Sequence, residues 1–240
     1  TTTARKTRKG ITITGKKSIV INHAIASHLI VFATTNPALG RAGMNAFLVD
    51  ARIPGITIGK ASYSKGMINS VIGDVFFDKC VAPEQSRLGE EGSGYFLLME
   101  TLDKGRPLVA ACCVGSAKRA FDLILDRAKK RAQFGKTLFS FQGISFSLAE
   151  YATRIQASRL LAYDALSRID LGRSFTMEAS MAKLHAGETL YDISSFGMEM
   201  LGYRSAMPFQ EISRIHYDAQ LMKSIDGTAN VQKMVIASQL

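Results

Sequence analysis

Residues 141–172 read FQGISFSLAEYATRIQASRLLAYDALSRIDLG, and this stretch decides the structural class of the C-terminal part of the chain. Leu148, Ile155 and Leu166 recur close to the 3.6-residue period of an α-helix, which predicts one long helix that ends near Gly172. Long helices with one apolar face and short connections pack as an antiparallel bundle. The same periodicity predicts further helices at about residues 95–131, 174–202, 208–222 and 228–240.

The N-terminal part follows a different pattern. Between Gly10 and about Pro83, short runs of β-branched and apolar residues alternate with turn signals, and no helical period connects them. A hairpin turn is predicted at Thr14–Lys17, where glycine follows threonine between two apolar runs. The predicted fold is therefore α+β, with a small antiparallel β-barrel domain at residues 1–88 and an antiparallel four-helix bundle at residues 89–240.

The composition is that of a globular protein. Of 240 residues, 47% are hydrophobic and 21% are charged, which excludes a disordered or collagen-like chain. No stretch approaches the roughly 18 consecutive apolar residues of a membrane helix, so we expect no membrane span. Cys80, Cys112 and Cys113 cannot form a disulfide framework, and the four histidines are scattered. We therefore expect reduced thiols and no metal site.

The net charge of +10 allows three interpretations. Such a charge is typical of a solvated basic face, of binding to a polyanionic ligand such as a nucleotide, or of binding to nucleic acid. We do not expect a nucleic-acid partner, because zinc-finger, helix-turn-helix and RNA-binding signatures are missing. The sequence also lacks the glycine-rich motifs of Rossmann dehydrogenases and P-loop NTPases and the nucleophile elbow of α/β-hydrolases.

Five segments in register carry a resemblance to a known family. Residues 131–138 (RAQFGKTL) and 141–150 (FQGISFSLAE) resemble a signature of the acyl-CoA dehydrogenase family. Residues 77–95, 103–106 (DKGR) and 226–232 (DGTANVQ) resemble the same family in the same order. The family fold has an N-terminal helical domain, a middle β domain and a C-terminal four-helix bundle. Only the last two correspond to this sequence, so the first would belong to a longer protein or to another chain.

The resemblance implies an FAD-dependent enzyme that removes an α-proton and a β-hydride from an acyl-CoA thioester. A carboxylate must act as the base, and the flavin must accept the hydride. Asp226 matches the position that usually holds the catalytic glutamate, and its side chain is one methylene shorter. Some relatives carry the base at the position that matches Gly105, and glycine cannot act as a base.

The resemblance also implies which residues bind the cofactor and the substrate. Asp103 and Arg106 match residues near the thioester and the pantetheine arm. Arg131 matches an arginine that crosses a subunit boundary to reach the flavin pyrophosphate. The full set of predicted FAD-binding residues is Arg131, Phe134, Gln142, Gly202, Gly227, Thr228 and Asn230.

Several positions depart from the family pattern. Ile19 and Ile21 replace the aromatic and the threonine that contact the flavin ring, while Glu199 and Tyr203 replace a glutamine and a glycine near its pyrophosphate. Two alternatives therefore stay open. One is a catalytically incomplete partner subunit of a hetero-oligomeric acyl-CoA dehydrogenase. The other is a related flavin oxidase that uses an aspartate base, such as one that oxidises nitroalkanes.

The resemblance finally implies partners and a compartment. Members of the family form tetramers, so a homo- or hetero-tetramer is expected, with electron-transfer flavoprotein as the usual electron acceptor. The compartment expected from the resemblance is the cytoplasm or the mitochondrial matrix.

Overall fold

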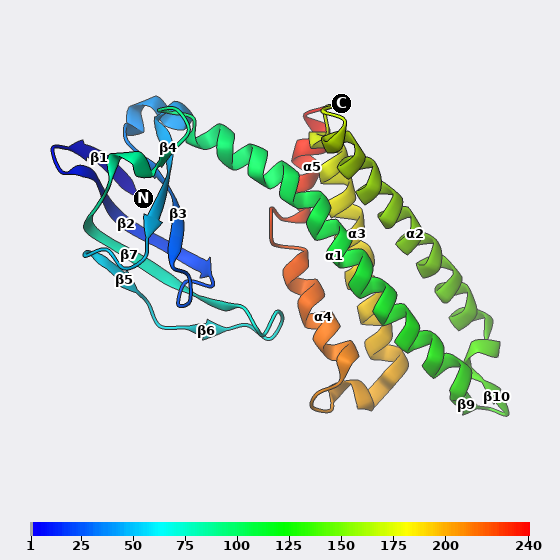
Figure 1. Cartoon of the computed structure of the whole chain (residues 1–240). Coiled ribbons are helices and arrows are strands. Elements are labelled where there is room, and N and C mark those ends of the chain that lie inside the picture. Colours follow the sequence, from blue (N-terminus) through cyan, green and yellow to red (C-terminus); the bar gives the residue numbers. More distant parts are fainter. Residues whose placement is uncertain (1) are drawn as a thin grey trace. The chain divides into compact units, whose positions relative to one another are not determined.

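A computed structural model describes residues 2–240 of the chain. It divides into two compact units, which are described separately below. The first comprises the residues up to Ser64 together with Ile68–Thr101, and the second comprises Lys65–Met67 together with Leu102–Leu240. The first unit is built mainly of strands and the second mainly of helices (Figure 1), which confirms the predicted α+β class. A domain boundary at residues 88 and 89 stays a prediction.

The first unit contains one sheet of eight strands. Its hydrogen-bonded order is β5-β7-β2-β1-β3-β4-β8, with β6 also paired to β7. The pairs are antiparallel except for a parallel contact between β1 and β3 at Thr3 and Thr34. In residues 2–240 no ladder joins the edge strands β5 and β8, which have three and two residues, so the closure of a barrel is not seen. The strands are β1 Thr3–Thr7, β2 Gly10–Ile21, β3 His28–Thr34, β4 Met44–Asp50, β5 Ile56–Ile58, β6 Ser62–Tyr63, β7 Val71–Ala82 and β8 Arg87–Leu88.

The predicted hairpin turn at Thr14–Lys17 is wrong. These residues lie inside β2, and the turn of the first hairpin is instead at residues 7–10, where Thr7 pairs with Gly10. Gly15 has a φ of 142° and follows a register shift between β2 and β7. A glycine inside a strand often marks such an irregularity, because it adopts backbone angles that other residues avoid. The same sequence signal therefore has two structural outcomes.

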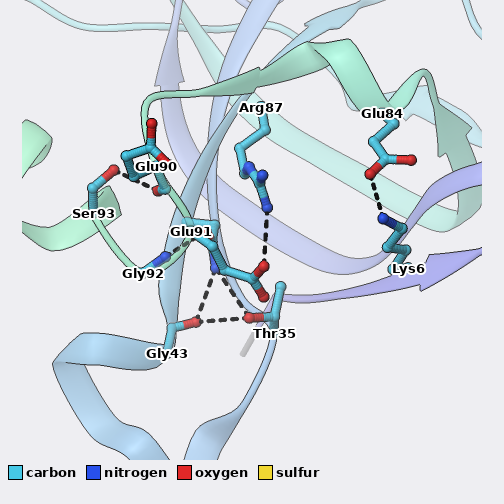
Figure 2. Close-up of polar contacts among 10 residues, drawn as sticks. Lys6, Thr35, Gly43, Glu84, Arg87, Glu90, Glu91, Gly92 and Ser93 are labelled. Atoms are coloured by element: carbon cyan, nitrogen blue, oxygen red, sulfur yellow. Dashed lines mark hydrogen bonds and ion pairs between the residues drawn. The ribbon is translucent and has the colours of Figure 1, made fainter.

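The segment before the first helix is attached to the sheet by polar contacts. Figure 2 shows Lys6 of β1 paired with Glu84, and Arg87 paired with Glu91. The buried side chain of Asn45 accepts a hydrogen bond from the backbone of the same segment, at Gly92 (2.9 Å). These contacts hold residues 84–92 against the sheet, directly before the first long helix begins at Gly94.

The second unit is a bundle of long helices. The predicted helices are confirmed, with ends that differ from the prediction by a few residues. A small antiparallel hairpin of β9 (Ala132–Gln133) and β10 (Lys136–Thr137) connects the first two helices. The helices are α1 Gly94–Lys130, whose first residues belong to the first unit, α2 Gln142–Asp170, α3 Thr176–Leu201, α4 Glu211–Met222 and α5 Ala229–Ala237.

Small residues allow the helices of the bundle to approach one another closely. Ala179, Ala182, Ala186 and Leu190 form the buried stripe of α3, and its glycine Gly197 packs directly against Ile212 of α4. Within residues 2–240, no helix is both long enough and apolar enough to cross a membrane. The buried residues of the bundle also include polar side chains, among them Arg106, Lys183 and Gln232.

Candidate functional site

The loop between α4 and α5 carries Asp226, the predicted base. Its backbone has a φ of 51°, in the left-handed region that only a few non-glycine residues adopt, and Gly227 follows with a φ of 97°. A Cβ atom added to Gly105 of α1 would lie 3.0 Å from Oδ2 of Asp226. The carboxylate thus lies against α1 at a position where any larger side chain would touch it.

The residues that flank Gly105 on α1 form a polar network inside the bundle. Arg106 is 3% exposed, and its Nη1 donates to Oδ1 of Asp103 (2.5 Å) and to Oγ of Ser180 (3.2 Å). The other carboxylate oxygen of Asp103 accepts a hydrogen bond from Thr176 (2.9 Å). Asp103 and Arg106 thus form a pair that α3 holds in place, and their role in substrate binding stays a prediction. Among the described residues, Nε of Arg106 is buried and has no hydrogen-bond partner.

Two buried side chains near Asp226 were not predicted from the sequence. Lys183 of α3 is 2% exposed, and its ammonium donates to the carbonyl oxygens of Lys223 (3.0 Å) and Gly227 (2.6 Å). Gln232 of α5 is also buried, and its amide donates to the carbonyl oxygens of Asp226 (2.9 Å) and Gly227 (3.1 Å). The sequence contains one indication of Lys183: it lies one helical turn after Ala179, on the apolar face of α3.

The remaining predicted residues near Asp226 lie at the start of α5. Gly227 directly follows the candidate base, and Thr228 is the N-cap of the helix, with its hydroxyl accepting from the Val231 N–H (3.5 Å). Thr228 and Asn230 are exposed. A helix N-terminus carries a partial positive charge and unpaired N–H groups, which favour negatively charged groups nearby.

Three other predicted cofactor residues lie around the β9–β10 hairpin. Phe134 and Gly135 form its two-residue turn with φ values of 52° and 78°, a geometry typical of a type I′ turn. The side chain of Phe134 is 92% exposed at the tip. Arg131 precedes the hairpin, Gln142 begins α2, and both are exposed. The hairpin therefore holds an aromatic ring away from the bundle.

Three arginines gather near this end of the bundle. Burial lowers the pKa of Arg127, and the neighbouring positive charges of Arg204 and Arg131 lower that pKa further. Nε of Arg127 is buried and has no hydrogen-bond partner in residues 2–240. Arg204 follows Gly202, which ends α3 with a φ of 59°. Clustered cations with an unused donor fit an anionic group such as the pyrophosphate of FAD.

The predicted cofactor residues thus form two groups that the chain keeps apart. Oγ of Ser158 in α2 hydrogen-bonds with Nδ1 of His185 in α3 (2.8 Å), so these two residues lie at the same level of the bundle. Lys183, which contacts the Asp226 loop, is two residues from His185. At 1.5 Å per residue, Gln142 lies roughly 24 Å from that level along α2. In Figure 1 the hairpin and α5 likewise lie at opposite ends of the bundle.

The positions predicted to contact the flavin ring lie in the first unit. Ile19 and Ile21 are 76% and 50% exposed at the end of β2. Ile19 has a φ of 57°, which is rare for a β-branched residue, and lies in a register shift between Lys17 and Val20. The end of β2 therefore presents aliphatic surface where the family carries an aromatic ring and a hydroxyl.

Two parts of the chain match known protein families. Residues 92–240 match the profile described as "Acyl-CoA dehydrogenase, C-terminal domain". Residues 1–80 match the one described as "Acyl-CoA dehydrogenase, middle domain". The chain belongs to the acyl-CoA dehydrogenase family. Its predicted membership is thereby confirmed.

Individual members of the acyl-CoA dehydrogenase family support the assignment. The chain is 36% identical to the human mitochondrial short-chain specific acyl-CoA dehydrogenase, over 100% of this chain and 58% of that protein. It is 33% identical to the caffeyl-CoA reductase–Etf complex subunit CarC of Acetobacterium woodii, over 95% of this chain and 60% of that protein. Among solved structures, butyryl-CoA dehydrogenase from Megasphaera elsdenii superposes with a TM-score of 0.94 at 34% identity, over 100% of this chain and 63% of that one. The chain therefore spans about 60% of the length of these relatives.

Proposed function

We propose that this chain supplies the middle β domain and the helical bundle of an FAD-dependent acyl-CoA dehydrogenase. One observation carries the proposal: the carboxylate of Asp226 lies against α1 at Gly105, directly beside the buried Arg106–Asp103 pair. A partly buried carboxylate that is held in a fixed position is the kind of group that abstracts a proton α to a carbonyl. The relatives are named for reactions of acyl-CoA thioesters, which agrees with this chemistry.

In the proposed reaction the residues of this chain handle the proton. Asp226 accepts the α-proton of the thioester on its carboxylate, and the electrons of the broken Cα–H bond form the new double bond. FAD, when bound, accepts the hydride that leaves the β-carbon. The backbone of Asp226 is in the left-handed conformation, and its side chain, which is shorter than that of glutamate, lies against Gly105 of α1. Because Gly105 has no side chain, the carboxylate has room at this position. Arg106 and Asp103 hold the thioester end of the substrate in place.

The two groups of cofactor residues suggest how FAD is held. Gly227, Thr228 and Asn230 at the start of α5 would contact the FAD of their own chain. Arg131, Phe134, Gln142 and Gly202 would contact the FAD of a second copy, since roughly 24 Å of helix separates them from the first group. This division supports an oligomer in which each cofactor lies between two subunits, and a homo- or hetero-tetramer is the form proposed from the family.

The electron acceptor and the compartment are proposed from the relatives. One relative is named as a subunit of a complex with Etf, and one structural neighbour is titled an electron transferring flavoprotein, from Acidaminococcus fermentans, with a TM-score of 0.95 at 30% identity. We therefore infer electron-transfer flavoprotein as the partner. The relatives include a mitochondrial enzyme and bacterial enzymes, so either the mitochondrial matrix or the bacterial cytoplasm is the proposed compartment.

The visible absorption spectrum of the purified protein tests the proposal. Near one FAD per chain, bleached anaerobically by an acyl-CoA, is the expected result. A folded protein that stays colourless after addition of FAD would instead support the incomplete partner subunit. Bleaching by a nitroalkane and not by any acyl-CoA would support the oxidase.

Replacement of the base tests the mechanism. Asp226→Asn keeps the size of the side chain and removes the proton acceptor, so we expect flavin to stay bound and its bleaching by acyl-CoA to be abolished. The rate of flavin bleaching and the flavin content are measured on the same preparation. A variant that still bleaches at the wild-type rate would remove Asp226 from the mechanism.

A further inference from the structure

Two buried side chains from neighbouring helices hold the loop that carries Asp226. Lys183 of α3 and Gln232 of α5 donate four hydrogen bonds to backbone carbonyls at Lys223, Asp226 and Gly227. Both side chains are almost completely buried, so these bonds form where water does not compete. The loop is thus fixed through its backbone, directly on both sides of the candidate base.

Lys183 lies on the interior face of α3. It is one turn after Ala179, and Gly187, one turn further, faces the same loop, since a Cβ at Gly187 would lie 3.9 Å from the Lys223 side chain, an ordinary contact distance. An ammonium brought into this interior loses its hydration, and this loss lowers the pKa of Lys183. The helix therefore carries a costly group at a place where an apolar residue would pack.

Among the described residues, Lys183 makes no ion pair with an acidic side chain. Burial raises the pKa of the nearby Cys113 thiol to about 12, so this thiol is protonated at neutral pH and carries no charge. Asp226 is the other group whose negative charge favours the ammonium. In residues 2–240, the hydrogen-bond partners of the lysine are the two loop carbonyls. The arrangement is directed at the loop and not at a paired acid.

Gln232 supports the same loop from the opposite side. Its amide nitrogen donates to both Asp226 and Gly227, while its amide oxygen is buried without a partner among the described residues. An unsatisfied buried oxygen is unfavourable, and the orientation that leaves it unsatisfied is the one that donates twice to the loop. Gly227 therefore receives one hydrogen bond from each side chain.

We propose that Lys183 is a positioning residue, which fixes the backbone of residues 223–227 so that Asp226 keeps its left-handed conformation with its carboxylate against Gly105. This role rests on the proposed function of Asp226 as the base. Gln232 completes the attachment from α5. Among the described residues, the ammonium of Lys183 hydrogen-bonds only with the loop backbone, and in this role it takes no part in proton transfer.

Hydrogen exchange of the full chain tests this role with Lys183→Met, which keeps the length and removes the donors. The amides of Ser224 and Ile225 report on the loop, because both donate to the Leu221 carbonyl (2.8 and 3.0 Å). Loss of a hydrogen bond from a charged donor predicts exchange at these amides roughly 10- to 100-fold faster, with unchanged exchange at the centre of α3. The matched control is Lys233→Met. Lys233 is exposed, and its ammonium makes only a long ion pair with Glu188, at 3.8 Å. We expect it to leave both regions unchanged.

Contrary outcomes are equally specific. Unchanged exchange at Ser224 and Ile225 would overturn the role, and so would equal acceleration over the loop and the whole of α3. If Lys183→Met does not fold, Lys183→Gln takes its place, since it retains a neutral donor, and it is expected to give intermediate exchange. Failure of both variants to fold would assign Lys183 to general stability and overturn the proposal.

A kinetic measurement separates positioning from binding. In the flavin-loaded protein, Lys183→Met is expected to slow flavin bleaching at saturating acyl-CoA about 10-fold or more, with an unchanged half-saturating concentration. A raised half-saturating concentration at an unchanged bleaching rate would overturn the role. Because the exchange measurement needs no flavin, it tests Lys183 even if Asp226→Asn shows that Asp226 is not the base.

Discussion

Two regions of the bundle carry predicted site residues, and they are built in opposite ways. The loop at 223–228 is fixed by buried donors from α3 and α5. The hairpin at 132–137 is joined to the bundle at its base, and its tip presents Phe134 with 92% of the side chain exposed. Both regions contain a non-glycine residue with positive φ, Asp226 in one and Phe134 in the other.

The difference agrees with the two roles proposed for these regions. A carboxylate that abstracts a proton needs a fixed position, and the buried donors around the loop would provide it. In the proposed function a second subunit would cover the exposed ring of Phe134, and the pyrophosphate of FAD would pair with the arginines. Proton transfer would then take place within one chain, and cofactor binding would be shared between two.

The largest expected effect concerns the hairpin. If its tip packs against a second copy, Phe134→Ala removes an aromatic side chain from that interface. We expect the dissociation constant for self-association to rise roughly 10- to 100-fold, because the burial of one Phe side chain contributes about 1.5–3 kcal/mol. Because the ring is exposed in the isolated chain, the free energy of unfolding should change by less than about 0.5 kcal/mol.

Sedimentation at several concentrations measures this effect. Leu171→Ala is the control, since Leu171 is 60% exposed at the far end of α2. Equal effects of the two variants on self-association would contradict a specific role for the hairpin.

The second prediction tests the loop from the side of α1. Gly105→Ala places a methyl group 3.0 Å from Oδ2 of Asp226, so the carboxylate must move by a few tenths of an ångström. Since displacement by about 1 Å costs on the order of 10²-fold, we expect the rate of flavin bleaching to fall roughly 10-fold. In contrast, the free energy of unfolding should rise by up to about 1 kcal/mol, because alanine is the better helix former.

Gly115→Ala is the matched control on the same helix, because no other group lies within 4 Å of its added Cβ. It should stabilise the bundle and leave the rate unchanged. A Gly105→Ala protein that bleaches at the wild-type rate would show that the position of Asp226 tolerates this displacement.

The smallest expected effect is a pH dependence of the bundle that carries both regions. Burial lowers the pKa of His185 and of His216 below the usual 6.5. The unfolded chain therefore binds protons that the folded chain does not, so stability is full above pH 6.5 and falls as pH drops through the window between 6.5 and the lowered values. Each histidine contributes at most about 1.4 kcal/mol per pH unit within that window.

Urea denaturation at pH 7.5 and 5.5, followed by helix content, measures this change. His185→Gln with His216→Gln should flatten the dependence, and an equally steep fall in the double variant would assign it to other groups.

Much of the fold follows from local patterns in the sequence. The helices were predicted because apolar residues such as Leu148 and Ile155 repeat with the helical period over several turns, and a long pattern averages out single exceptions. The turn at Thr14–Lys17 was wrong because glycine permits a turn and a strand irregularity equally well, and only the pairing with β7 selects one. A barrel was predicted although the sheet has open edges, because closure depends on pairing between strands that are distant in the sequence. Local patterns of residues do not specify such pairing.

The site could be predicted only where its residues follow a family motif. Asp103, Arg106 and Asp226 were proposed from such motifs, and α1 and the α4–α5 loop bring Gly105 and Asp226 together. Lys183 and Gln232 were missed because their hydrogen bonds are made to backbone atoms. A bond from Lys183 to a residue 40 positions away leaves no pattern of paired side chains in the sequence.

The attachment of the loop through carbonyl oxygens separates the acid from its support. Every amino acid carries the same carbonyl, so the hydrogen bonds from Lys183 and Gln232 do not depend on the side chain at position 226. Replacement of Asp226 by glutamate would therefore leave these bonds in place without a compensating change in the helices. The identity of the acid and the position of its backbone are thus encoded by different residues of the chain.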